Sequence, residues 1–75
     1  MTMRTRKLVL CLRNTGYEAS LERRKIYAMI PDRAAAAHQQ VRVVDESGED
    51  YLYPATFFAP ITLPTSLRRK VLAAV

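Results

Sequence analysis

Apolar and polar residues alternate in several short segments of this chain, a pattern typical of half-buried β-strands. The clearest case lies in residues 25–30, where Ile26, Ala28 and Ile30 share one face. Residues 8–12 are apolar without a break, which indicates a strand covered on both faces. Together with the β-rich segments further along, these patterns predict five strands, over residues 7–13, 25–30, 41–44, 50–53 and 57–62.

The third and fourth predicted strands flank a polar turn, which predicts a β-hairpin. Asp45 suits the first position of a type I turn, because its carboxylate can accept a hydrogen bond from the backbone two residues on. Gly48 suits a position of positive φ, where a side chain would clash. The prolines at positions 60 and 64 flank the last strand, so we expect that strand to lie at an edge or to contain a bulge.

Two segments have the composition of helices. Residues 32–39 contain four consecutive alanines, and Asp32 precedes them as an N-cap. Residues 66–75 form the second, with Thr65 or Ser66 as the cap and apolar residues at helical spacing, at Leu67, Val71, Leu72 and Val75.

Five short strands with turns between them and one brief central helix predict a mainly β fold, a small five-stranded antiparallel barrel. A chain of 75 residues has room for one domain. We therefore assign residues 1–75 to a single domain, with the barrel over about residues 7–63 and a C-terminal tail over residues 64–75.

The single cysteine, Cys11, excludes an internal disulfide and fits a reducing cytosol. The basic N-terminus followed by apolar residues is similar to an export signal, but the apolar run covers only residues 8–12, so we interpret it as a strand. No apolar run approaches the roughly 18 residues that span a bilayer. We expect a cytoplasmic protein with no membrane partner.

The net charge is +5, and the charges are unevenly distributed. Acidic residues gather at the hairpin tip, at Asp45, Glu46, Glu49 and Asp50. Basic residues form three clusters, and such clusters attract phosphate backbones. One lies at the N-terminus, at Arg4, Arg6 and Lys7; the candidates for contact with nucleic acid are the other two, Arg23, Arg24, Lys25, Arg68, Arg69 and Lys70.

The sequence gives little support for catalysis, and we expect no enzyme activity, metal or cofactor. His38 is the only histidine and lies near the end of the alanine-rich helix, where a solvated role is expected. Cys11 is expected to be a buried strand residue rather than a nucleophile. The acidic hairpin tip lacks the ordered spacing of a calcium loop, so we interpret it as a charged turn.

Six aromatic residues are the most informative set. With Tyr53 and Phe58 inside the barrel, the remaining candidates can line an outer groove for an extended peptide, at Tyr17, Tyr27, Pro54 and Phe57. The same groove, with the basic cluster at residues 23–25, could stack nucleic-acid bases. The alternative is that the rings only seal a barrel too small to hide them.

The segment Tyr53-Pro54-Ala55-Thr56-Phe57-Phe58-Ala59-Pro60-Ile61 resembles the end of a Src-homology-3-like (SH3-like) barrel. In that fold a strand, a proline, a short 3₁₀ turn ending in an aromatic residue and a last strand follow one another. Residues 21–30 are similar to the segment that leaves the first loop of the fold and enters its second strand. The resemblance implies that Pro54 and Phe57 line a groove for proline-rich peptides and that Phe58 enters the core.

The chain departs from the peptide-binding members, because it has no tryptophan and no tyrosine at residues 11–14. It also resembles short bacterial proteins that share a D-E-S-G-E-D-Y-L-Y-P-A block, which implies a bacterial source and no particular activity. We expect a non-catalytic module, a monomer or weak dimer, that binds a protein or peptide. The alternatives are a nucleic-acid-associated protein and an accessory protein, of phage or plasmid origin, with a purely structural role.

Overall fold

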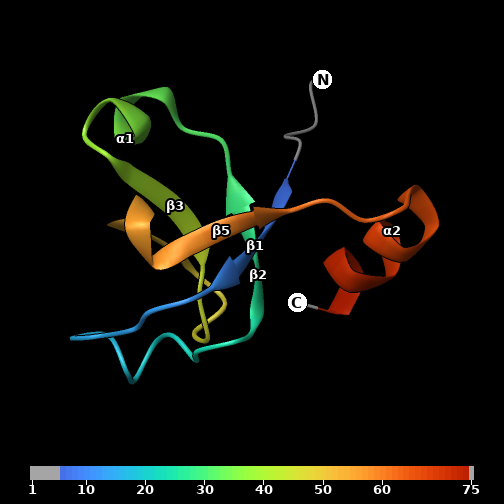
Figure 1. Cartoon of the computed structure of the whole chain (residues 1–75), viewed down its shortest axis with the longest axis horizontal. Coiled ribbons are helices and arrows are strands. Elements are labelled where there is room, and N and C mark those ends of the chain that lie inside the picture. The colour runs from blue at the N-terminus through green and yellow to red at the C-terminus, as the bar shows by residue number, and fades with distance from the viewer. Residues whose placement is uncertain (1–5, 75) are drawn as a thin grey trace.

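The computed structural model describes residues 6–74. The mainly β fold is confirmed, with five strands in one sheet and a C-terminal helix (Figure 1). The elements in chain order are β1 (Lys7–Cys11), β2 (Ile26–Ile30), α1 (Arg33–Ala37), β3 (Gln40–Val44), β4 (Asp50–Pro54), the 3₁₀ turn η1 (Ala55–Phe57), β5 (Phe58–Ile61) and α2 (Thr65–Ala74).

The sheet is antiparallel throughout and has the strand order β4-β3-β2-β1-β5. The first strand therefore pairs with the last, with Leu8 opposite Ile61. Although β4 and β5 are the outer strands, the ring centroids of Tyr53 and Phe58 lie only 6.2 Å apart. The sheet is thus strongly curled around its interior, while its closure into a barrel stays a prediction.

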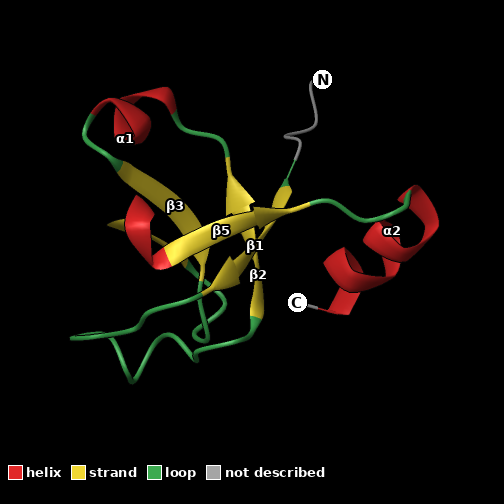
Figure 2. Ribbon diagram, in the orientation of Figure 1, coloured by secondary structure: helices red, strands yellow, loops and turns green. Residues whose placement is uncertain are grey.

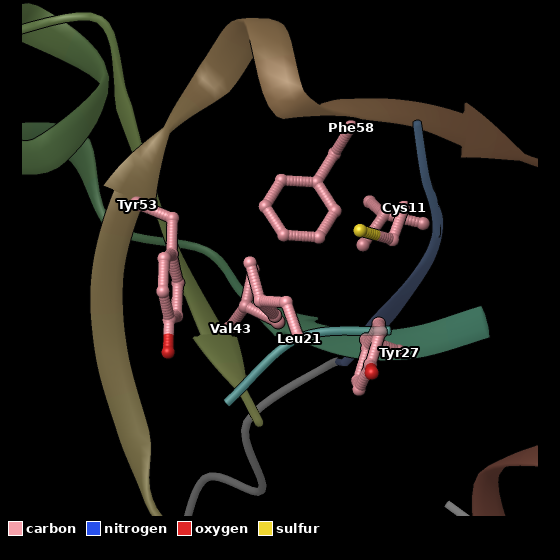
Figure 3. Packing of buried hydrophobic residues seen from close by; sticks show 7 residues of the cluster. Cys11, Leu21, Tyr27, Val43, Tyr53 and Phe58 are labelled. Carbon is pink, nitrogen blue, oxygen red and sulfur yellow. The ribbon is translucent and has the colours of Figure 1, made fainter. Parts of the chain in front are cut away.

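The interior of the curled sheet holds the main hydrophobic cluster (Figure 3). Its members come from all five strands and from the loop between β1 and β2, and they are Val9, Cys11, Leu21, Tyr27, Val43, Tyr53 and Phe58. Leu8, on the opposite face of β1 from Val9, is also buried. The predicted coverage of this strand on both faces is therefore confirmed.

Several predicted element ends differ from the structure, each for a local reason. β1 ends at Cys11 rather than at residue 13, because the N–H groups of Leu12 and Arg13 both turn to the carbonyl of Phe57. The helix predicted over residues 32–39 covers only Arg33–Ala37, since the backbone turns out of the helix at His38 and Gln39, the latter with φ of 58°. Asp32 caps this helix as predicted, by accepting from the N–H of Ala35.

The segment after β4 has the local structure that its sequence suggested. Pro54 ends β4, η1 follows, and Phe58 begins β5 as a buried residue, so Phe57 lies in the turn rather than in the predicted strand. The edge position predicted for the last strand is confirmed. The C-terminal helix begins at Thr65, so both predicted caps, Thr65 and Ser66, are helical residues and that prediction is wrong; Val75 lies outside the described residues.

The hairpin turn between β3 and β4 follows the predicted pattern. The N–H of Ser47 donates to the Asp45 carboxylate, the N–H of Gly48 donates to the Asp45 carbonyl, and Gly48 has φ of 83°. A side chain at Gly48 would meet nothing within 4 Å, so backbone conformation alone decides the cost of replacing it.

We expect Gly48→Ala to lower the free energy of unfolding by about 1 kcal/mol, the cost of holding an alanine in the left-handed region. Urea unfolding of the variant and of the unmodified protein measures this difference. Gly48→Asn is the control, because asparagine tolerates positive φ and should lose less. Equal losses for the two variants would contradict the conformational explanation.

Candidate functional site

Three of the four predicted groove residues meet at one surface. The rings of Tyr17 and Phe57 are in edge-to-face contact, with centroids 5.9 Å apart. Pro54 and Phe57 stand at the two ends of η1, and a separation of three residues in a 3₁₀ turn places side chains on the same side. The backbone N–H of Leu12, whose side chain is exposed, donates to the Phe57 carbonyl. We call the set Leu12, Tyr17, Pro54 and Phe57 the aromatic surface.

A long loop joins β1 to β2 (Figure 2). Hydrogen bonds within this loop hold Tyr17 in place. The N–H of Tyr17 donates to the Asn14 carbonyl, and the Asn14 side-chain amide donates to the carbonyl of Leu21. Leu21 is buried in the core and anchors the loop to the sheet. The Tyr17 ring also contacts that of buried Tyr53, at 5.0 Å between centroids, yet 41% of Tyr17 remains exposed. A large aromatic ring is thus held rigidly at the surface.

Tyr27 does not belong to this surface, so the prediction that it lines the groove is wrong. Its side chain is only 3% exposed, and its ring packs edge-to-face with Phe58 inside the sheet. The reason is that Tyr27 lies on the face of β2 that packs against the main hydrophobic cluster. Its hydroxyl accepts from the N–H of Glu22 and donates to the carboxylate of Glu46. Tyr27 therefore links the core to the hairpin tip.

Two carboxylates of the hairpin tip take part in networks that sequence reasoning missed. Asp45 is buried and accepts from the hydroxyl of Tyr53 at 2.5 Å and from Ser47. Burial alone would raise the pKa of Asp45, but the hydrogen bonds from Ser47 and Tyr53 outweigh it and the pKa is lowered. Asp45 lies two positions after Val43, so strand periodicity predicts that the two residues share a face. The sequence did not show that this face is the inner one, which the burial of Val43 in the structure reveals.

Glu46 forms the second network. Its carboxylate lies 2.6 Å from the ammonium of Lys25, and it also accepts from Tyr27. Lys25 and Tyr27 hold the pKa of Glu46 below its usual value, and the bond to Glu46 raises the pKa of Lys25. The acidic tip is therefore more than a charged turn, because it fastens the first loop to the β3–β4 hairpin.

A hollow of about 270 Å³ adjoins the loop that carries Tyr17. It is lined by Asn14, Glu18, Leu21, Glu22 and Glu46. Glu46 is paired with Lys25, whereas Glu18 accepts only a backbone bond, from Gly16, among the described contacts. The hollow gives the neighbourhood of Tyr17 an acidic character.

The basic clusters have different environments. Arg23 and Arg24 are exposed in a turn before β2, and Arg24 has φ of 67°. Lys25 beside them is neutralised by Glu46. On α2, Arg69 and Lys70 are exposed, while the half-buried Arg68 donates to the carbonyl of Arg6. The bond from Arg68 thus brings the C-terminal cluster to the start of β1.

Cys11 is fully buried as predicted, and burial raises the pKa of its thiol, which donates to the Arg13 carbonyl. His38 is exposed just after α1. Within residues 6–74, no three His, Cys, Asp or Glu side chains are grouped to hold a metal ion. No helix in the same range is long and apolar enough to cross a membrane.

Comparison of the whole chain with family models, with curated proteins and with solved structures gives no match.

Proposed function

We propose that this chain is a non-catalytic interaction module that binds an extended, proline-rich peptide on the aromatic surface. The observation that carries the proposal is the edge-to-face contact between the exposed ring of Tyr17 and the half-buried ring of Phe57, beside half-buried Pro54. Aromatic rings held at a surface suit polyproline II segments, because these segments are already extended and lose little entropy on binding.

The acidic hollow next to Tyr17 narrows the class of peptide. Glu18 and Glu22 lie in the same loop as Tyr17, and both line that hollow. A lysine or arginine in the peptide can therefore pair with a carboxylate while neighbouring prolines rest on the rings. We expect proline-rich peptides that contain a basic residue to bind more tightly than those without one.

The test uses fluorescein-labelled proline-rich peptides of about ten residues, each made with and without a central arginine, and measures binding by anisotropy. Tyr17→Ala should weaken binding about tenfold or more, because buried aromatic anchors dominate such interfaces. The matched control is Tyr51→Ala, which removes another exposed tyrosine, from the hairpin instead. Phe57→Ala should also weaken binding, with little dependence on salt.

Circular dichroism of each variant separates lost binding from lost folding. Glu18→Gln should weaken only the arginine-containing peptides. Equal losses for Tyr17→Ala and Tyr51→Ala, or no binding by any peptide of the set, would contradict the proposal.

A further inference from the structure

Acidic residues are confined to one half of the sequence. All seven lie between residues 18 and 50, together with five basic residues. Residues 1–17 and 51–75 contain the other seven basic residues and no acid, which accounts for the net charge of +5. The two ends of the chain are therefore purely cationic.

The fold joins these two ends. β1 pairs with β5 along four positions, and α2 follows β5 directly (Figure 1). The guanidinium of Arg68 donates to the carbonyl of Arg6, which holds α2 to the start of β1. Lys7 and Arg68 line one hollow of about 380 Å³, together with Leu8 and residues 60–63, none of them acidic. Arg69 and Lys70 follow Arg68 in α2 and are exposed, so they add two cations around the same part of the helix. We call Lys7, Arg68, Arg69 and Lys70 together the basic face.

The charges of the basic face are not neutralised by ion pairs within the described part of the chain. The three ion pairs found there join Lys25 to Glu46 and Arg42 to Asp32 and Asp50, all in the acid-containing half. A neighbouring hollow contains acids: Asp45 and Glu46 line it together with Arg6, Lys25 and Ala74 at the end of α2, and Glu46 is already paired with Lys25. A group of unpaired cations in an acid-free region attracts a polyanion.

From this arrangement we infer that the basic face binds the phosphate backbone of nucleic acid, without sequence preference. This inference does not rest on the proposed peptide site, which lies elsewhere. The cations supply phosphate contacts, while the face includes no aromatic residue to stack a base. A membrane surface fits less well, because Val71 and Leu72 of α2 are half-buried and Leu67 is the one large apolar residue of this helix that is exposed among the described residues.

The experiment titrates the full chain into two labelled DNA duplexes of unrelated sequence between 50 and 200 mM salt. Both duplexes should bind with affinities within about threefold of each other, and affinity should fall steeply with salt. Arg69→Gln combined with Lys70→Gln should weaken binding at 50 mM salt about tenfold or more. The slope of log affinity against log salt should become shallower by about 1.8, the value for two lost phosphate contacts.

The control is Arg23→Gln combined with Arg33→Gln, which removes the same charge from exposed positions in the other half. It should weaken binding less than about threefold. Equal losses for the two double variants would show an effect of net charge alone and overturn the assignment. The absence of binding at 50 mM salt, a marked preference between the duplexes, or binding only to vesicles rich in phosphatidylglycerol would overturn it as well. Tyr17→Ala should leave duplex binding unchanged, which keeps this test separate from that of the peptide site.

Discussion

Replacing Tyr27 with alanine should lower the free energy of unfolding by about 3–5 kcal/mol, the range for aromatic residues removed from a core. The ring is almost fully buried and contacts Phe58, and its hydroxyl holds Glu22 and Glu46. A domain of this size has a total stability of only about 4–11 kcal/mol. The variant should therefore lose a large part of the stability of the domain, as measured by urea unfolding followed by circular dichroism.

Tyr27→Phe distinguishes the contribution of the ring to stability from that of the hydroxyl. It keeps the packing against Phe58 but leaves the N–H of Glu22 and the carboxylate of Glu46 without this partner, so we expect a loss of about 1–3 kcal/mol. If Tyr27→Ala were as stable as the unmodified protein, Tyr27 would be a surface residue after all. A Tyr27→Phe variant as unstable as Tyr27→Ala would place the whole contribution in the hydroxyl.

The sequence predicted those features that depend on neighbouring residues. The alternation in residues 25–30 indicated β2, the alanines after Asp32 indicated α1, and Asp45 with Gly48 indicated the hairpin turn. Each of these rests on backbone preferences or on hydrogen bonds within a few residues. The five strands and the mainly β class followed from them.

The sequence did not decide which face of a strand the core would take. In β2 the alternation predicted one buried face, with Ile26, Ala28 and Ile30. Ala28 and Ile30 are indeed buried, but Tyr27 on the opposite face is buried as well and belongs to the main cluster. Choosing between the two faces requires the partners across the sheet, which lie far away in the chain. For this reason the prediction that Tyr27 lines the outer groove was wrong, whereas Tyr17 and Phe57, predicted to lie together, are in contact.

Long-range contacts also determine what the charged residues do. Residues 23–25 and 68–70 are similar runs of three cations, and the sequence offered no ground for ranking them. In the structure, Glu46 from the hairpin reaches Lys25, whereas pairing of β1 with β5 gathers cations around Arg68. The difference arises from the topology of the sheet, which places one run beside acids and the other beside the cationic N-terminus.

Protonation of Asp45 should destabilise the fold in acid. The pKa of this carboxyl is lowered in the folded protein, so the unfolded chain takes up the proton first as the pH falls. The stabilisation is complete above the unfolded value of about 3.9 and is lost as the pH drops through the lower folded value. Glu46 and Asp32 also have lowered pKa values, so they contribute to the same loss of stability at low pH.

Asp45→Asn should therefore have two effects. At pH 7 it replaces a charged acceptor of the Tyr53 and Ser47 hydrogen bonds with a neutral group, and we expect a loss of about 1.5–3 kcal/mol. As the pH falls below the unfolded value, its free energy of unfolding should fall less steeply than that of the unmodified protein. Urea unfolding at pH 7 and at this lower pH measures both.

The double variant of Asp45→Asn with Tyr53→Phe shows whether the two residues act as a pair. Because Tyr53 donates to Asp45 inside the protein, removing both groups should cost clearly less than the sum of the single losses. Glu46→Gln is the control. It removes a carboxylate that contacts Lys25 and Tyr27, so it should change the loss of stability at low pH without changing the effect of Tyr53→Phe. Suppose that the losses for Asp45 and Tyr53 are additive and that Asp45→Asn loses stability at low pH as steeply as the unmodified protein does. The buried carboxylate would then not hold the hairpin to the core.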